Sequence, residues 1–340
     1  MKMPLERTDQ TIVACQNYWS FLPLSTELEK YGPRFGMVRD DCAGVYRRLD
    51  QGEVHFAFCS TISLARNADF EMALPVGVVH ESSNGLAYWG LIHSLPGFKD
   101  YVGERIQALR DIFRWAQLSR TDNLKQALQA AIDEVQNLPR PRLESVPLIR
   151  FNNGYTSWSV LSRLMYKLLF GSEAFETMLR LGSSNVPGEG QEFQMELKVE
   201  NEALQRRCSY RSVIDLADLW RSMTGMPFVS SILQKTRRCQ AQNCRSSLAG
   251  ITELAEMRMQ VEPCNYLPDM LPCNTQQQTI DLCGVWRSLS YRLTAEDLRS
   301  LLVFLYLAKP LEKKGLEDEA FTLKMLRWQQ REAGLPSLMA

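Results

Sequence analysis

The first third of the chain alternates short apolar runs with segments of helical period. The apolar runs have the length and composition of strands buried in a sheet that is covered on both faces. The predicted strands are residues 11–15, 55–59, 74–79 and 87–93. Helices are predicted over residues 24–31 and 42–51, because Asp41 can cap the second helix and Gly52 can end it. Strands and helices that alternate in this way predict an α/β fold.

The rest of the chain holds longer amphipathic segments separated by polar turns. Residues 215–223 have the helical period, Gly225 follows them as a stop signal, and Pro227 suits the first position of a strand. Further helices are predicted over residues 101–119, 123–137, 157–170, 281–289, 294–308 and 318–333, and further strands over 146–151 and 193–199.

Composition places the chain among ordinary globular proteins. Its 340 residues are enough for two domains, and 45% of them are hydrophobic, which argues against a disordered chain. The 39 basic residues equal the 39 acidic residues, so no basic excess favours binding to nucleic acid or to an anionic membrane. No apolar run is long enough to cross a membrane, and the amino-terminal residues lack a signal-peptide pattern. We therefore expect a cytoplasmic protein without nucleic-acid or membrane partners.

The spacing of cysteine and histidine residues gives no sign of a metal site. The nine cysteines are odd in number and irregularly spaced, which favours reduced thiols over a disulfide framework. Cys239 with Cys244 and Cys264 with Cys273 do not combine into the spacing of a zinc site, and the three histidines show no ligand spacing. The sequence also contains no Gly-rich phosphate loop and no Gly-x-Ser-x-Gly elbow. We expect no metal ion and no cofactor.

Two pairs of hydroxyl residues lie where α/β proteins bind anionic ligands. Ser60 and Thr61 follow the predicted strand 55–59, at the carboxyl edge of the sheet. Thr156 and Ser157 begin the predicted helix 157–170, where unpaired N–H groups and the helix dipole favour a carboxylate or a phosphate. Ordinary helix capping is the alternative explanation for both pairs.

The segment from Tyr210 to Val229 carries the pattern Asp-Leu-Ala-Asp-x-Trp-x-x-x-Thr-Gly-x-Pro-Phe-Val. This pattern resembles the approach to the hinge in chorismate dehydratases of the futalosine route to menaquinone, which are cytoplasmic lyases. Other blocks resemble segments of the same family in the same order, namely residues 18–24, 48–66, 155–161, 199–204 and 285–293. The resemblance spans residues 11–233 and 284–308, and the chain has extra residues near 97–145 and 235–280.

The resemblance implies a two-lobe α/β protein with the type II periplasmic-binding-protein-like fold and a ligand cleft between the lobes. Residues 1–92 together with 230–340 would form the first lobe, and residues 93–229 would form the second. The chain would thus pass from the first lobe into the second and return.

The resemblance also implies which residues line the cleft. Ser20 stands where the family has an Asn implicated in catalysis, and Asn17, three residues earlier, is a second candidate for that role. Trp89 stands where the family has a substrate-binding Ser, and the family's Gly-Asp pair is here Glu200-Asn201. The predicted substrate-binding residues are Ser60, Thr61, Ser83, Asn84, Trp89, Tyr155, Thr156, Ser157 and Asn201.

Several of these residues also have a purely structural interpretation. Asn84 with Gly85 is a strong hairpin signal, and the aromatic neighbours of Ser20 would pack a core as readily as they would line a pocket. Glu200 could act as a base in a dry cleft, as could Glu202, or both could lie solvated in a loop. His80, which precedes the Ser-Ser-Asn-Gly turn, is the histidine best placed for acid–base chemistry.

The leading function implied by the resemblance is removal of water from chorismate or a related small carboxylate, giving a carboxyvinyloxybenzoate without a cofactor. The family implies little nucleophilic machinery, because the enolpyruvyl carboxylate of the substrate can serve as the base. One alternative is a non-catalytic or repurposed small-anion-binding protein, since Ser20 and Trp89 replace groups that touch the substrate. Another is a different enzyme of specialised metabolism on the same scaffold. The sequence leaves the ligand and the oligomeric state open.

Overall fold

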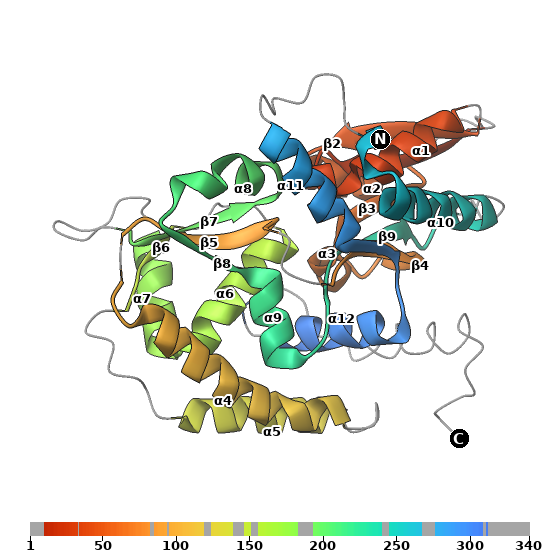
Figure 1. Ribbon diagram of the computed structural model, residues 1–340. Helices are drawn as coiled ribbons and strands as arrows, with labels where there is room; N and C mark the ends of the chain where they lie inside the picture. The colour runs from red at the N-terminus through yellow and green to blue at the C-terminus, as the bar shows by residue number, and fades with distance from the viewer. Residues whose placement is uncertain are drawn as a thin grey trace.

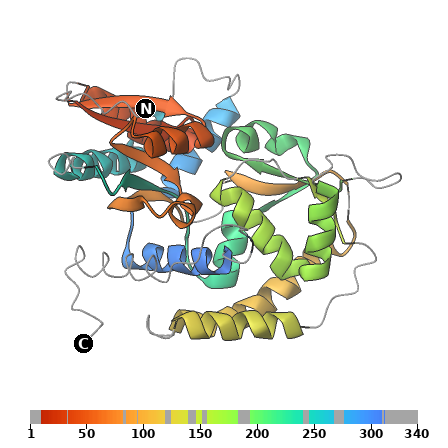
Figure 2. The same cartoon turned by 180° about the vertical axis from the view of Figure 1, so that it is seen from behind.

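The computed structural model describes residues 10–32, 34–81, 85–93, 95–118, 124–138, 146–150, 156–182, 193–239, 245–266, 276–308 and 311. These residues form two α/β lobes, each built on its own sheet, which lie side by side when seen from the front (Figure 1) and from behind (Figure 2). The α/β class that the sequence predicts is confirmed. The Ser83, Asn84 and Tyr155 candidates and the predicted helix over residues 318–333 lie outside the described residues.

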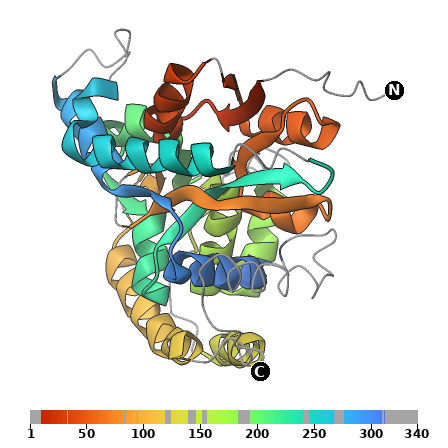
Figure 3. The same cartoon turned by 90° about the vertical axis from the view of Figure 1, so that its right-hand side faces the viewer.

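The first sheet has six strands of mixed polarity. In spatial order they are β10 (Leu289–Arg292), β4 (Phe70–His80), β9 (Phe228–Thr236), β3 (Phe56–Ser60), β1 (Thr11–Gln16) and β2 (Phe35–Asp40). β1 pairs in parallel with β2 and β3, whereas β9 runs antiparallel to β3 and β4. Figure 3 shows β4 and β9 running beside each other. Because β9 and β10 come late in the sequence, segments from both halves of the chain build this lobe.

The second sheet has four strands. Their order is β6 (Ile149–Arg150), β7 (Met195–Val199), β5 (Ala87–Leu91) and β8 (Ser212–Asp215). β5 is antiparallel to both β7 and β8. β5 lies before the boundary at residues 92 and 93 that the sequence predicts, yet it pairs with the strands of the second sheet. The chain therefore changes sheets between β4 and β5, and it returns between β8 and β9.

Helices pack around both sheets. Those of the first lobe are α1 (Leu22–Lys30), α2 (Cys42–Gln51), α3 (Ile62–Arg66), α10 (Arg245–Val261) and α11 (Gln276–Arg287). Those of the second lobe are α4 (Phe98–Leu118), α5 (Leu124–Asn137), α6 (Ser157–Phe170), α7 (Ser172–Gly182), α8 (Glu200–Arg206) and α9 (Leu216–Thr224). The helix α12 (Ala295–Ala308) follows β10 but contacts α5 and α6 as well as β9. It therefore packs against both lobes (Figure 1).

Local sequence signals account for the ends of two helices. Asp41 caps α2 by accepting a hydrogen bond from Gly44 N at 2.6 Å, and Gly52 ends the helix with a φ of 72°. Asp215 caps α9 by accepting hydrogen bonds from two backbone N–H groups of its first turn, and Gly225 ends that helix with a φ of 72°. Both φ values lie in the left-handed region, which glycine adopts without a steric cost.

A cluster of buried aromatic rings, which we name the aromatic junction, joins the lobes. The ring centroid of Phe228, at the start of β9, lies 4.7 Å from that of Trp158 on α6 and 5.1 Å from that of Phe304 on α12. Trp220 of α9 and His80 of β4 lie 6.0 and 6.4 Å from the Phe228 ring. All five side chains are buried. The aromatic junction thus packs strands of the first lobe directly against helices of the second.

Gly77 lies where β4 and β9 approach too closely for a side chain. A Cβ at this position would lie 2.3 Å from the backbone oxygen of Ser231 and 3.1 Å from Cγ2 of Ile232. We expect Gly77→Ala to lower the free energy of unfolding by about 1–3 kcal/mol, measured by urea denaturation. The control is Gly250→Ala on α10, where a Cβ meets nothing within 4 Å and the helix should gain about 0.5–1 kcal/mol. Equal stability of the two variants would contradict this account.

Candidate functional site

Four segments of the chain meet where the two lobes face each other. The first lobe contributes the turn after β1, which contains the short helix η1 (Trp19–Phe21), and the residues that follow β3. The second lobe contributes the beginning of α6 and the turn from β7 into α8. Hydrogen bonds from Trp19 N to Asn201 and between Ser60 and Ser157 link the lobes. Because open α/β sheets bind ligands outside the carboxyl ends of their strands, we name this region the junction site.

The two predicted pairs of hydroxyl residues meet at the junction site. Ser157 Oγ lies 2.6 Å from Ser60 Oγ and 2.6 Å from Thr61 Oγ1. Thr156 caps α6, since its Oγ1 accepts a hydrogen bond from Ser159 N at 3.2 Å. All four predicted residues are buried. The capping explanation therefore accounts for Thr156, whereas Ser157 instead contacts the opposite lobe at the positive end of the helix dipole.

Asn17, Ser20 and Asn201 also lie at the junction site. The side-chain oxygen of Asn201 accepts a hydrogen bond from Trp19 N at 2.9 Å, and its amide nitrogen donates to Asn17 O at 3.2 Å. Asn201 therefore holds the turn after β1 through its backbone. The Asn17 side chain is exposed, whereas Ser20 is fully buried and its Oγ has no hydrogen-bond partner among the residues that the structure describes.

Glu200 begins α8 and buries its carboxyl group at the junction site. Its side chain is 2% exposed, and Oε1 accepts a hydrogen bond from Trp158 Nε1 at 3.1 Å. Burial raises the pKa of Glu200 from an ordinary value of 4.5 to about 7, and the nearby Trp158 and Ser20 side chains only partly offset that increase. The interpretation of Glu200 as a solvated loop residue is therefore wrong. Glu202, by contrast, is partly exposed and pairs with Lys198 at 2.7 Å.

The sequence contains one signal that could have singled out Glu200. It stands where the resembled family has a Gly, and its φ of 51° lies in the left-handed region that favours glycine. A large side chain at such a position strains the backbone more than glycine would.

Two other predicted candidates have side chains that are already engaged. Trp89 is fully buried in the second lobe, and its Nε1 donates a hydrogen bond to Ser162 Oγ at 2.6 Å. His80 Nε2 lies 2.8 Å from Ser230 Oγ, and the imidazole packs edge-on against Trp158 with ring centroids 4.6 Å apart. His80 is thus part of the aromatic junction, behind the residue that binds Glu200.

Within the described ranges, no group of three or more His, Cys, Asp or Glu side chains could hold a metal ion. Cys239 is described, but Cys244 and Cys273 lie outside the described residues, so neither cysteine pair is visible as a pair. In the same part of the chain, no helix combines the length and the hydropathy needed to cross a bilayer.

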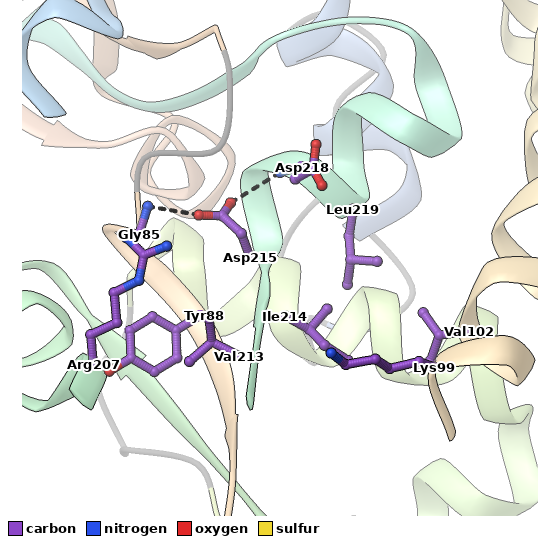
Figure 4. Close-up of a pocket in the computed structure, with 10 residues that line it drawn as sticks. All are labelled: Gly85, Tyr88, Lys99, Val102, Arg207, Val213, Ile214, Asp215, Asp218 and Leu219. Atoms are coloured by element: carbon purple, nitrogen blue, oxygen red, sulfur yellow. Dashed lines mark hydrogen bonds between the residues drawn. The ribbon is translucent and has the colours of Figure 1, made fainter. Parts of the chain in front are cut away.

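Two pockets lie apart from the junction site, and none of the predicted site residues lines either of them. One has a volume of about 330 Å³ and lies between β5, β8, α4 and α9 (Figure 4). Its Asp215 carboxylate already accepts hydrogen bonds from Gly85 N at 2.7 Å and from Asp218 N at 3.0 Å, so it serves as a cap. The other has a volume of about 520 Å³ and is lined largely by apolar side chains of α5, α6 and α12.

Comparison with known proteins identifies the fold. No protein-family profile matches the chain, and no curated protein matches its sequence. Protein AF1704 from Archaeoglobus fulgidus is 11% identical with a TM-score of 0.55, over 90% of this chain and 99% of that one. The periplasmic aliphatic sulphonate binding protein SsuA from Escherichia coli is 10% identical with a TM-score of 0.53, over 95% and 98%.

A third structure names the fold directly. The CA3427 gene product of Candida albicans, described as exhibiting the generic periplasmic binding protein structural fold, is 12% identical with a TM-score of 0.52. That match covers 94% of this chain and 95% of the other. The chain therefore has a two-lobe, periplasmic-binding-protein-like α/β fold, as its sequence predicts.

Proposed function

We propose that the chain binds a small carboxylate at the junction site and removes water from it, as a carbon–oxygen lyase acting on chorismate or a related acid. The observation that carries the proposal is the contact of Ser157 with Ser60 and Thr61 across the lobes. Hydroxyl groups from both lobes converge at the N-terminus of a helix, which supplies the donors and the positive potential that a carboxylate requires.

The same contacts suggest how a ligand would close the lobes. Ser60 and Thr61 now bond to Ser157, and a carboxylate placed among them would accept hydrogen bonds from both lobes at once. Such a ligand favours the closed arrangement, as in other two-domain binding folds. The name of the Escherichia coli SsuA protein states that it binds aliphatic sulphonates, which are also compact organic anions. That likeness supports an anionic ligand for this chain.

The resemblance to chorismate dehydratases supports elimination of water as the reaction. Ser20 and Asn17, the catalytic candidates that the resemblance implies, lie in the turn that Asn201 holds at the junction site. In this reaction the protein orients the acid and stabilises the charge that develops as the hydroxyl leaves. No cofactor is needed for that chemistry.

Binding of a small anion without catalysis is the second candidate function, and Trp89 favours it. Trp89 replaces the substrate-binding Ser of the resembled family, and its indole is committed to Ser162. A side chain packed in this way cannot offer a substrate the hydroxyl that the family provides. The chain would then hold a carboxylate between its lobes and release it unchanged.

Incubation of the purified protein with chorismate, followed by liquid chromatography and mass spectrometry, tests the proposal. We expect loss of one water and accumulation of a carboxyvinyloxybenzoate over many turnovers. The double variant Thr156→Ala with Ser157→Ala should lower kcat/KM by about tenfold or more, because donors to a charged group are lost. Ser172→Ala, which removes an exposed hydroxyl at the start of α7, is the control and should change nothing.

The two candidate functions are separated when the melting temperature of the protein with chorismate is measured beside that experiment. Chorismate that raises the melting temperature of the protein but is recovered unchanged would select the binding function. Chorismate that neither binds nor reacts would overturn both.

A further inference from the structure

We propose that Glu200 is the proton-transferring residue of the junction site, which takes a proton from a carbon of the bound acid and returns it to the departing hydroxyl. This inference rests on the proposed elimination of water. It adds a group that the resembled family does not have at this position, where a Gly stands. The substrate class is a small carboxylate that carries a hydroxyl on the carbon next to the C–H bond that breaks.

The backbone holds Glu200 in a conformation that is unfavourable for a side chain. Its φ of 51° is the only positive value at a non-glycine residue within the described part of the chain. Backbone outliers of this kind persist where the surrounding fold imposes them, and they gather at active sites. A sharp strand-to-helix turn is also how hydrolases lift their nucleophile out of the sheet. Glu200 likewise lies at the point where a strand, β7, passes directly into a helix, α8.

Two buried polar atoms mark the place where a reacting group would sit. Glu200 Oε2 and Ser20 Oγ are both inaccessible to solvent, and neither makes a hydrogen bond of good geometry to a described residue. The Ser20 hydroxyl is nonetheless close enough to Glu200 to favour its ionised form, so the two atoms lie together. A buried oxygen and a buried hydroxyl without well-formed hydrogen bonds are costly to the fold, and a bound ligand would satisfy both.

Oε1 of Glu200 is fixed by a hydrogen bond, and this sets the direction in which Oε2 points. Trp158 Nε1 donates to Glu200 Oε1 at 3.1 Å. The Trp158 ring is itself held in the aromatic junction, with centroids 4.6 Å from His80 and 4.7 Å from Phe228. Glu200 therefore has one oxygen anchored to the core and a second oxygen without a well-formed hydrogen bond, which is the arrangement that an oriented general base needs.

Burial, and not a charged neighbour, determines the protonation state of Glu200. Tyr18, beside η1, and Cys42, on α2, are titratable groups that interact electrostatically with Glu200. Burial raises the pKa of Tyr18 above its usual range and that of Cys42 to about 11, so both are neutral near pH 7. Lys198, on β7, forms ion pairs with two other carboxylates. No cation in the described residues pairs with Glu200, so its carboxyl can exchange a proton near neutral pH.

The proposed step balances without any co-reactant. The ionised Glu200 takes a proton from the C–H bond, and the electron pair of that bond forms the new C=C bond. The adjacent C–O bond breaks, and the departing hydroxide takes the proton that Glu200 holds and leaves as water. Glu200 is again a carboxylate, and one acid has given one unsaturated product and one water. The Ser20 hydroxyl lies beside Glu200 and can donate a hydrogen bond to the departing group.

The experiment compares the wild type with Glu200→Gln, Glu200→Asp and Glu104→Gln, measuring kcat and KM for chorismate from about pH 5 to about pH 9. Gln keeps an acceptor for Trp158 Nε1 but cannot carry the proton, so we expect kcat to fall about 10²–10⁴-fold with KM little changed. The wild-type kcat should rise with pH as Glu200 ionises, and Glu200→Gln should lose that rise. Glu200→Asp should recover part of the rate, and Glu104→Gln, exposed on α4, should match the wild type.

The outcomes distinguish a failure of this inference from a failure of the proposed function. If the wild type converts chorismate and Glu200→Gln does so with the same kcat and pH profile, the inference is overturned while the proposed function stands. If the wild type does not convert chorismate, the reaction is wrong and both fall. If Glu200→Gln does not fold, Glu200→Asp decides: a lower kcat with a displaced pH profile supports the inference, and unchanged kinetics overturn it.

Discussion

Glu200→Gln is expected to remove about 3 kcal/mol of the pH dependence of the folding free energy. Burial raises the pKa of Glu200 from 4.5 to about 7 in the folded chain, and each pKa unit corresponds to about 1.4 kcal/mol. Between these two values the folded chain holds a proton on Glu200 that the unfolded chain has released. The stabilising contribution is fully present below about pH 4.5 and is lost as the pH rises through 7.

The difference in stability between the wild type and Glu200→Gln isolates the contribution of Glu200 from those of the other carboxyl groups. Gln behaves like a permanently neutral Glu, so the variant should lack this loss of stability and gain on the wild type as the pH rises. Burial also raises the pKa of Asp215 and of Asp297, but both remain in the two proteins and cancel in the comparison.

Urea denaturation of the wild type, Glu200→Gln and the exposed control Glu104→Gln at about pH 4 and about pH 8 measures this effect. Two stability curves that stay parallel with pH would show that Glu200 ionises as easily in the folded chain as in the unfolded one. The acid–base role proposed for it would then lose its physical basis. A parallel result for Glu104→Gln is expected, because its side chain is exposed.

Several strands inside the sheets are predicted well from the sequence. β1, β3 and β7 begin and end within two residues of the predicted runs, because interior strands have continuous or alternating apolar residues. The strands β2, β8 and β10 were not predicted, and each lies at the edge of its sheet. An edge strand pairs on one side only and tolerates polar residues, so its hydrophobic pattern is weak.

The sequence also predicts the candidate site only as far as local signals allow. Ser60, Thr61 and Ser157 could be placed from local signals, since the end of a strand and the start of a helix are visible in the sequence. The importance of Glu200 depends on its φ, its burial and the Trp158 side chain, which are set only when segments far apart in the sequence pack together. A glutamate in place of a glycine was therefore visible in the sequence, but its environment was not.

Phe228→Ala is expected to lower the free energy of unfolding by about 3–5 kcal/mol, the usual cost of a cavity left by a buried aromatic ring. Phe228 is fully buried, and its ring packs against the rings of Trp158 and Phe304. The measurement is urea denaturation at pH 7. Phe228→Leu, which fills more of the space, should cost less, and Tyr31→Ala should cost little because Tyr31 is 42% exposed.

The loss in Phe228→Ala should extend beyond stability to the junction site, because Phe228 supports the ring that binds Glu200. Trp158 packs against both Phe228 and His80, and a cavity in place of the Phe228 ring lets its indole turn away from Glu200 Oε1. Oε1 would then lose its donor, and the carboxyl would become still harder to ionise. We therefore expect the pH at which kcat rises to move upward in Phe228→Ala but not in Tyr31→Ala. A variant that loses stability without this displacement would mean that Trp158 is held in place by the second lobe alone.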